Sequence, residues 1–193
     1  MKHSKRFAIL LLSSTAAACV TEPLVNEPLE WRPTSTLNAS SVDNSSHTRI
    51  QFGPFTDARQ DPQLIAENNE DDVPKRVTTN GDVGAFVGHH LRELFDHGGL
   101  NTVDEGGDVI VTGEVRQFFV HETSTYKGDV AVHLTMRSRD GAVLWEGAIS
   151  GSATRFGRSY NLENYYEVLS DSLINATDTL MQDFDFRAAL AKR

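Results

Sequence analysis

Histidine and glutamate side chains gather in one short stretch of the sequence, at His89, His90, Glu93 and His97. His89 and Glu93 are four residues apart, so on a helix they would share one face, as a pair of metal ligands does. His90 would fall beside the apolar face of that helix, and His97 in its last turn, where a histidine favours the helix dipole. Because three ligands do not align and no HExxH or other full ligand set is present, we expect no metal here.

The other candidates for catalysis lack a partner at the right spacing. The acidic run ENNEDD, residues 67–72, has no DxDxDG pattern that would wrap a calcium ion, which favours a solvated loop. We expect Asp57 and Arg59 to form a local ion pair and not a catalytic dyad, because no nucleophile or second acid lies at a spacing that would place it beside them. The sequence contains no GxSxG, P-loop or dinucleotide fingerprint. We therefore expect no enzyme activity, no cofactor and no small-molecule substrate.

The only cysteine, Cys19, ends a segment with the three-part plan of a secretory signal. Residues 1–6 carry three basic side chains and no acid, residues 7–12 are wholly apolar, and residues 13–18 are small throughout. Cleavage after Ala18 would make Cys19 the new N-terminus, and this arrangement resembles the lipobox of bacterial lipoproteins, in which a small residue precedes the lipidated cysteine. The resemblance implies that Cys19 carries several acyl chains, which together give stable membrane attachment.

Two neighbours of Cys19 bear on where the protein would reside. Val20 follows the cysteine, whereas in enteric-type lipoproteins an Asp there signals retention at the inner membrane, so the resemblance points to the outer membrane. Ala16 stands where that family usually carries Leu, and an ordinary signal peptidase could cut the same bond. The alternative is therefore a plain secreted protein with a free thiol.

The charge balance restricts the partners. Loss of residues 1–18 would remove three of the 18 basic residues and none of the 27 acidic ones, which changes the formal charge from −9 to −12. Such an acidic chain argues against a nucleic-acid partner, because phosphates must be neutralised by Lys and Arg. No run of about 18 or more apolar residues is present, which argues against a membrane-spanning helix.

The N-terminal third of the mature chain is predicted to be mostly irregular. Residues 19–46 are rich in Ser, Thr, Asn, Pro and Glu without a strand or helix period, which predicts a flexible tether. Alternating apolar residues then predict a strand from about Thr48 to Gly53, interrupted by Pro54. The polar stretch that follows, residues 56–81, predicts a long acidic loop.

The rest of the sequence predicts two helices and three strands. An apolar face at helical spacing, capped by Asn80 or Asp82 and stopped by a glycine pair after residue 97, predicts the first helix. Three alternating segments predict antiparallel strands, the last two joined by a hairpin turn at Asp140 and Gly141. A long amphipathic helix capped by Asn161 ends the domain.

This order of elements is typical of an α+β fold. We expect a two-layer sandwich in which two helices pack on one face of a mainly antiparallel sheet of about four to five strands. The other face would be open to water, since polar residues alternate with the apolar ones; they are Thr112, Glu114, Arg116, His133, Thr135 and Arg137. The expected divisions are a signal peptide (1–18), a lipid-anchored flexible tether (19–46), a periplasmic domain (47–186) and a C-terminal tail (187–193).

The order of several short motifs resembles the YajG-like family of small bacterial lipoproteins. The motifs are the Cys19 anchor, FTDARQD after the first strand, HLRELFDHGGL leading into DVIVTGEV, the DGAVLWEG hairpin and the closing helix, within residues 47–186 for all but the anchor. More distantly, the arrangement is similar to periplasmic lipoproteins that assist secretion pores, peptidoglycan synthases or lipid transporters. The resemblance implies a role in the cell envelope and supplies no catalytic residues.

We therefore favour a non-enzymatic outer-membrane lipoprotein whose periplasmic domain binds or scaffolds another envelope component, as an accessory to an assembly, transport or peptidoglycan machine. The alternative is a periplasmic metal-dependent hydrolase that uses the helix with His89, His90 and Glu93. The expected partners are the membrane, through Cys19, and an envelope protein. Aromatic residues near the strand ends are the candidates for that protein interface: Phe119, Tyr126, Phe156 and Tyr160.

Overall fold

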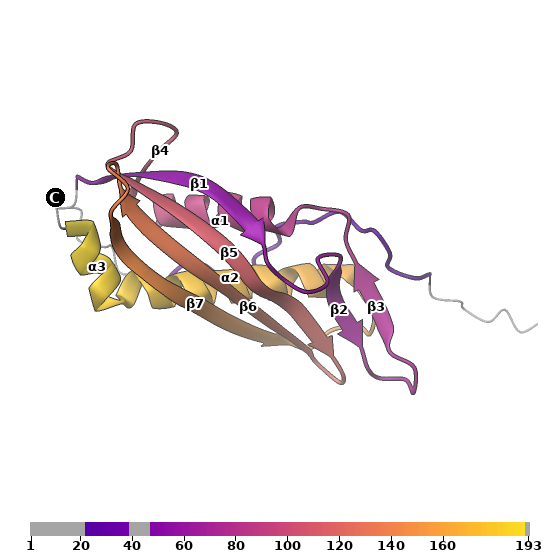
Figure 1. Ribbon diagram of the computed structural model, residues 1–193. Coiled ribbons are helices and arrows are strands. Elements are labelled where there is room, and N and C mark those ends of the chain that lie inside the picture. The colour runs from indigo at the N-terminus through magenta and orange to yellow at the C-terminus, as the bar shows by residue number, and fades with distance from the viewer. Residues whose placement is uncertain (1–21, 39–46, 192–193) are drawn as a thin grey trace, which may run out of the picture.

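A computed structural model describes residues 22–38 and 47–191, in which seven strands form one sheet and three helices lie beside it (Figure 1). The strands are β1 (Arg49–Asp57), β2 (Leu64–Asn68), β3 (Lys75–Thr78), β4 (Asn101–Val103), β5 (Val109–Glu122), β6 (Tyr126–Ser138) and β7 (Val143–Arg155). The helices are α1 (Val83–His97), α2 (Leu162–Gln182) and α3 (Phe184–Ala191). None of these helices combines the length and the apolar character that a membrane-spanning helix needs.

Strand β5 is the centre of the sheet. Along one edge it pairs antiparallel with β6 over its whole length, and β6 pairs in turn with β7. Along its other edge β5 pairs parallel with β1 over Val109–Val115 and then with β2 over Val120–Glu122. Strand β4 extends the sheet beyond β1, and β3 extends it beyond β2.

Arg59 bridges the gap between β1 and β2 on this edge. Its guanidinium pairs with Asp57 at 2.7 Å, as the sequence predicted, and donates hydrogen bonds to the carbonyl oxygens of Leu64 (2.7 Å) and Phe118 (3.1 Å). The Arg59 side chain is only 7% exposed. Between the end of β1 and the start of β2, these backbone carbonyl oxygens lack a partner strand, and the buried guanidinium of Arg59 supplies their hydrogen bonds. The ion pair of Arg59 with Asp57 therefore has a structural role.

Both long helices cover the same face of the sheet, as predicted (Figure 1). Helix α1 packs on β1, β5 and β4, and α2 packs on β7, β6 and β5. Close approach of α1 depends on Gly84, where a Cβ atom would lie 2.8 Å from the carbonyl oxygen of Phe55. The predicted caps are observed too: the side chains of Asp82 and Asn161 accept hydrogen bonds from the first turns of α1 and α2.

The interior between the helices and the sheet is apolar and densely filled. The largest side chains with almost no exposure include Phe95, Phe118, Tyr165 and Leu173. They come from α1, β5 and α2, so each layer contributes to one continuous core. Burial of these residues is the main source of stability for a domain of this size.

The expectation of a mainly antiparallel sheet of four to five strands is corrected to a mixed sheet of seven. The antiparallel arrangement of β5, β6 and β7 was predicted, but β1 with β4, β1 with β5 and β2 with β5 are parallel pairs. The reason is that α1 carries the chain back across the sheet, so the next strand enters in the same direction as β1. A third helix, α3, also covers most of the expected tail and buries Leu190.

Two segments expected to be irregular are ordered. Residues 56–81 contain the end of β1 and the β2–β3 hairpin rather than one long loop. The described part of the expected tether, residues 22–38, packs against the domain; its larger apolar side chains, Leu24, Leu29, Trp31 and Leu37, contact the core. We call residues 22–38 the N-terminal segment. Residues 39–46, which also belong to the expected tether, lie outside the described residues.

Candidate functional site

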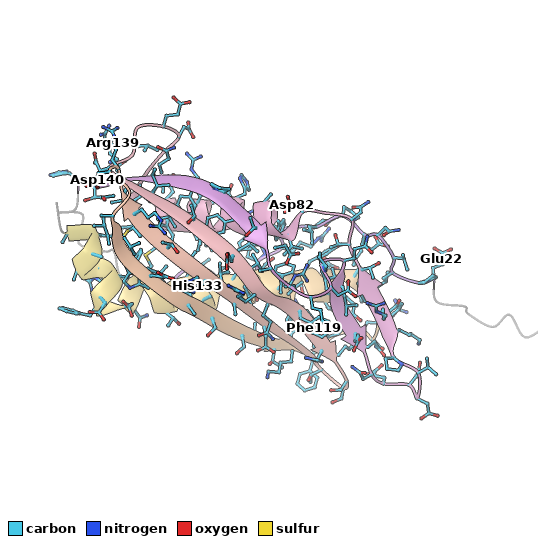
Figure 2. All side chains as sticks on the ribbon, viewed as in Figure 1. Glu22, Asp82, Phe119, His133, Arg139 and Asp140 are labelled. Atoms are coloured by element: carbon cyan, nitrogen blue, oxygen red, sulfur yellow. The ribbon has the colours of Figure 1, made fainter. Side chains whose placement is uncertain are left out.

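The open face of the sheet brings together the six polar residues predicted to lie there. All six line a shallow hollow of about 550 Å³ over β5 and β6, and Glu146 of β7 completes one side. His133, near the middle of the sheet in Figure 2, pairs through Nε2 with Glu146 at 2.9 Å. Arg116 forms an ion pair with Glu114. The hollow therefore presents both signs of charge on partly exposed side chains, with Glu114 and Glu146 near Arg116 and Arg137.

This chemistry is suited to contact. The lining residues of the hollow include threonines and no serine or cysteine, and the one histidine is engaged by a carboxylate. A polar face of mixed sign offers hydrogen bonds and charge complementarity to another protein surface, which give an interface its specificity. The hollow thus has the features of a docking surface.

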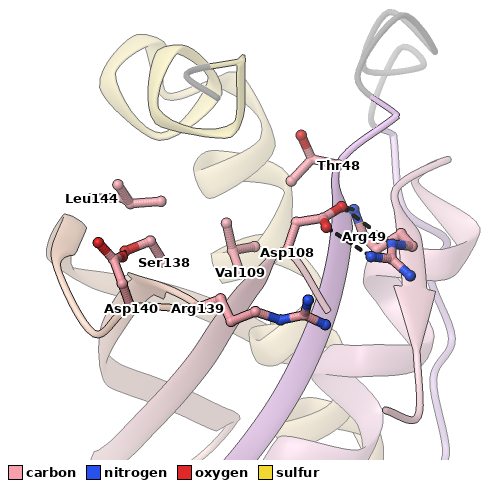
Figure 3. Close-up of a pocket in the computed structure, with 8 residues that line it drawn as sticks. All are labelled: Thr48, Arg49, Asp108, Val109, Ser138, Arg139, Asp140 and Leu144. Atoms are coloured by element: carbon pink, nitrogen blue, oxygen red, sulfur yellow. Dashed lines mark hydrogen bonds and ion pairs between the residues drawn. The ribbon is translucent and has the colours of Figure 1, made fainter. Parts of the chain in front are cut away.

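A second cavity, of about 740 Å³, lies where the sheet ends near β4 and α3 (Figure 3). Arg49 donates to Asp108 from its guanidinium at 2.8 Å and from its backbone N–H at 3.0 Å. These hydrogen bonds lower the pKa of Asp108 from 3.8 to about 2. Arg139 and Asp140 come from the β6–β7 turn; the Arg139 side chain extends toward Asp108 and donates to the carbonyl oxygen of Gly106 at 3.1 Å, and Val109 forms part of the apolar floor. This cavity holds two cations and two carboxylates, so it has no marked preference for either sign of ligand.

The histidine and glutamate cluster on α1, where the sequence predicted no metal site, is more convergent than expected. The donor atoms of His89, His90 and Glu93 all lie within 4.8 Å of one another. His90 does pack beside the apolar face, where its ring stacks on Trp31 at a centroid distance of 4.3 Å, yet its Nδ1 reaches Glu93 at 2.8 Å. Burial lowers the pKa of His90 below its ordinary value, against the opposing influence of the Glu93 carboxylate. His97 binds the backbone carbonyl of Glu93 instead.

The N-terminal segment is held on α2 by polar contacts as well as by its apolar side chains. Asp171 accepts hydrogen bonds from the backbone N–H groups of Thr34 (2.8 Å) and Ser35 (3.0 Å) and from both hydroxyls. Further along α2, Asp178 accepts from the backbone N–H of Asn38 at 2.8 Å. A carboxylate that accepts several hydrogen bonds holds the donating backbone in one position. The N-terminal segment is therefore an ordered part of the domain.

The four predicted interface aromatics have different surroundings. Phe156 is 81% exposed, and Phe119 is partly exposed on the open face (Figure 2). Tyr126 is 1% exposed, so in this structure it offers almost no surface to a partner; its hydroxyl accepts from the backbone N–H of Asn161. Tyr160 is partly buried, and its hydroxyl accepts from the backbone N–H of Leu24 at 3.0 Å. Cys19 and Ala18 lie outside the described residues.

Sequence reasoning missed Glu122, a carboxylate that is 1% exposed at the end of β5. It accepts hydrogen bonds from the hydroxyl of Tyr165 and from the backbone N–H of Tyr160 (2.8 Å). Burial raises the pKa of Tyr165 well above its ordinary value. Glu122 thereby positions the loop before α2, which carries Phe156. The only sequence signal was its place on the apolar side of the β5 alternation.

Comparisons with known proteins bear on the fold. No protein-family model matches the chain, and no curated protein is detectably similar to it in sequence. Among solved structures, a Xanthomonas campestris protein of the DUF330 family is similar over 81% of this chain and 91% of its own, with a TM-score of 0.51 at 11% identity.

Two further solved structures match with lower TM-scores. Lipoprotein GNA1162 from Neisseria meningitidis covers 60% of this chain and 90% of its own length, with a TM-score of 0.37 and 12% identity. The PelC dodecamer from Paraburkholderia phytofirmans covers 68% and 87%, with a TM-score of 0.42 and 13% identity. At these identities the comparisons concern the fold alone, and the fold of this chain is similar to that of the Xanthomonas protein.

Proposed function

We propose that the chain is a non-enzymatic, YajG-like lipoprotein, anchored in the outer membrane through Cys19, whose periplasmic domain binds another component of the cell envelope. The observation that carries this proposal is the difference between the two faces of the sheet. One face is covered by α1, α2 and the core they share, whereas the other presents a hollow of mixed charge. A face of this size and polarity is available to a partner without any cost in core packing.

The position of the N-terminal segment supports the anchored reading. Glu22, its first described residue, lies at the end of the molecule that carries β3, whereas Arg139 and Asp140 lie at the opposite end (Figure 2). Cys19 precedes Glu22 by three residues, which is at most about 11 Å of extended chain. An anchored domain would therefore stand close to the lipid surface, with the open face of the sheet to its side and the cavity near Asp140 facing away.

An envelope protein is the partner that this surface favours. The hollow combines Glu114 and Glu146 with arginine side chains, so a partner would meet both signs of charge in a fixed pattern. Phe156 is 81% exposed just after the end of β7, away from the hollow, so it would add an aromatic contact where a partner extends to that end of the sheet. Nucleic acid remains disfavoured by the net charge of the chain.

Site-specific photo-crosslinking in intact cells tests the docking surface. A photoreactive side chain at Thr135 or Ala148, both on the open face, should give a crosslinked protein partner. The same side chain at Ala85, an exposed position on α1, is the matched control and should give little product. Crosslinking at Ala85 but not at Thr135 and Ala148 would move the interface to the helix layer and contradict the proposal.

The anchor has a separate test. Cys19→Ser should abolish lipidation and move the protein from the membrane pellet to the soluble fraction, and the mass of the N-terminal peptide decides between lipid and free thiol. An unmodified Cys19 thiol in wild-type cells would leave a plain secreted protein. In that case the crosslinking experiment would still test the docking surface independently of the anchor.

The convergence of donor atoms on α1 favours a metal-dependent hydrolase as the second candidate function. A bound zinc ion could activate water at neutral pH. Turnover of an ester or peptide substrate by the purified chain, abolished by a chelator and by Glu93→Ala, would replace the non-enzyme proposal.

A further inference from the structure

Three side chains of α1, those of His89, His90 and Glu93, bring their donor atoms within 4.8 Å of one another. Glu93 lies one turn after His89 and His90 and between them on the helix surface, because steps of four and three residues fall on either side of one turn. His89 Nε2 is 3.4 Å from Glu93 Oε1, and His90 Nδ1 is 2.8 Å from Glu93 Oε2. A tetrahedral ion with bonds of about 2.0–2.1 Å holds its ligand atoms about 3.3 Å apart. The two distances from Glu93 are close to this value, and all three donors lie within 4.8 Å of one another.

The ring of His90 is held in place from two sides. Trp31 stacks on it at 4.3 Å with an interplanar angle of 11°, and Phe86 meets it edge-on at 4.5 Å. Only 12% of the His90 side chain is exposed. A ligand whose rotamer is fixed by packing loses little conformational freedom when an ion binds. The packing of Trp31 and Phe86 around His90 therefore raises the affinity for an ion.

The charges around the cluster are compatible with a cation. The neighbouring Arg92 turns to Asp104, with which it pairs at 2.6 Å, and His97 is engaged by the backbone carbonyl of Glu93 at 2.7 Å. Glu93 is thus the charged group that faces the two imidazoles, and it supplies one negative charge at the point where the donors meet.

We propose that His89, His90 and Glu93 bind one divalent transition-metal ion, with Zn²⁺ as the reference ion, on the surface of α1. Two imidazole nitrogens and one carboxylate oxygen suit Zn²⁺, Cu²⁺ and Ni²⁺, whereas Ca²⁺ and Mg²⁺ require more oxygen ligands. All three ligands come from one helix, so the ion adds no crosslink to the fold and keeps a coordination position open to solvent. The site is independent of the docking function proposed above.

Calorimetric titration with Zn²⁺ tests the site directly. The protein is the full chain carrying Cys19→Ser and no histidine tag, so that neither a thiol nor a tag competes for the ion. We expect one Zn²⁺ per chain, and at least about tenfold weaker binding in His89→Ala and in Glu93→Ala. Both side chains are largely exposed, so these variants should keep the wild-type circular dichroism spectrum.

His97→Ala is the matched control, since it removes a histidine from the same helix without removing a proposed ligand. Its affinity for Zn²⁺ should stay within about twofold of that of the parent Cys19→Ser protein, well below the tenfold loss expected when a ligand is removed. The proposal is overturned if Zn²⁺ does not bind, if His89→Ala and Glu93→Ala bind as well as the parent, or if His97→Ala loses as much affinity as they do. Equal binding of Ca²⁺ or Mg²⁺ would also overturn it, since that result indicates a diffuse acidic surface.

Discussion

The two faces of the sheet are made by the same strands and yet obey different constraints. On the covered face of β6, Val130, Val132, Leu134 and Met136 are almost fully buried under α2. On the open face the alternating residues, such as His133 and Thr135, stay partly exposed. Because neighbours in a strand point to opposite sides, one stretch of sequence specifies both the core and the surface. Stability and binding are therefore separable here, residue by residue.

The largest effect expected from this comparison is at Leu173, which is fully buried where α2 faces the sheet. Leu173→Asp should cost about 4 kcal/mol or more and unfold the domain, because an unpaired charge would enter the core. Ala148→Asp on the open face is the matched change and should cost less than about 1 kcal/mol. Urea denaturation of both variants measures the difference. Equal losses would mean that the two faces are not separable.

A smaller effect is expected where α2 touches β7 directly. A Cβ atom at Gly151 would lie 2.3 Å from backbone atoms of Ser172 and Ala176, so Gly151→Ala must push the helix outward. We expect a loss of about 1–3 kcal/mol from overpacking. Ser150→Ala, one residue earlier and on the open face, should change stability by less than about 0.5 kcal/mol. A wild-type urea midpoint for Gly151→Ala would show that the helix can move without strain.

Release of the N-terminal segment should cost less again. Asp171→Ala removes the carboxylate that accepts hydrogen bonds from Thr34 and Ser35; because these bonds are exposed and water can replace the lost acceptor, we expect a total cost of only about 1 kcal/mol. The expected result is faster hydrogen exchange of the Thr34 and Ser35 amides with little change in the melting temperature of the domain. Asp185→Ala, an exposed acid on α3, serves as the control. Unchanged exchange in Asp171→Ala would place the holding contacts elsewhere in the segment.

The smallest effect concerns the exposed pair at the sheet end. The pKa of Asp108 is lowered to about 2 by Arg49, so its ionised form is favoured in the folded state. Its contribution to stability is therefore present above the ordinary pKa of 3.8 and is lost as the pH falls through about 2. Exposure to solvent and salt screening keep that contribution small. Carboxyl NMR should show a midpoint near 2 that moves towards 3.8 in Arg49→Ala; a wild-type midpoint near 3.8 would mean that the pair is not populated.

The long periodic elements could be predicted from the sequence, and the short or aperiodic ones could not. Helices α1 and α2 and strands β5 to β7 carry many repeats of one apolar spacing, which local sequence reveals. Strands β2 and β3 have five and four residues, too few to establish an alternation against their acidic surroundings. The N-terminal segment has no period at all, since its apolar residues are spaced to match different parts of the domain: Trp31 packs on His90, Leu29 lies near Gly81 and Leu37 lies near Gly98.

The candidate sites were predicted in part for the same reason. Membership of the open face follows from alternation alone, so the residues of the hollow could be listed from the sequence. The convergence of His90 with His89 and Glu93 could not be predicted from the sequence, because the direction of the His90 ring is set by Trp31, a residue 59 positions earlier in the chain. The buried role of Tyr126 depends on the loop before α2, which tertiary contacts shape.

The N-terminal segment has a consequence for the order in which the molecule folds. Its hydrogen bonds to Tyr160, Ser170 and Asp178 join residues 136, 138 and 140 positions apart. Contacts of such long range form only after the intervening chain has been ordered, because closing a large loop carries an entropic cost that earlier packing reduces. Helix α2 is the last long element of the sequence, and the hydrogen bonds of the N-terminal segment to Ser170, Asp171 and Asp178 form only after that helix has reached the sheet. The part of the described chain that comes first in the sequence is therefore packed last.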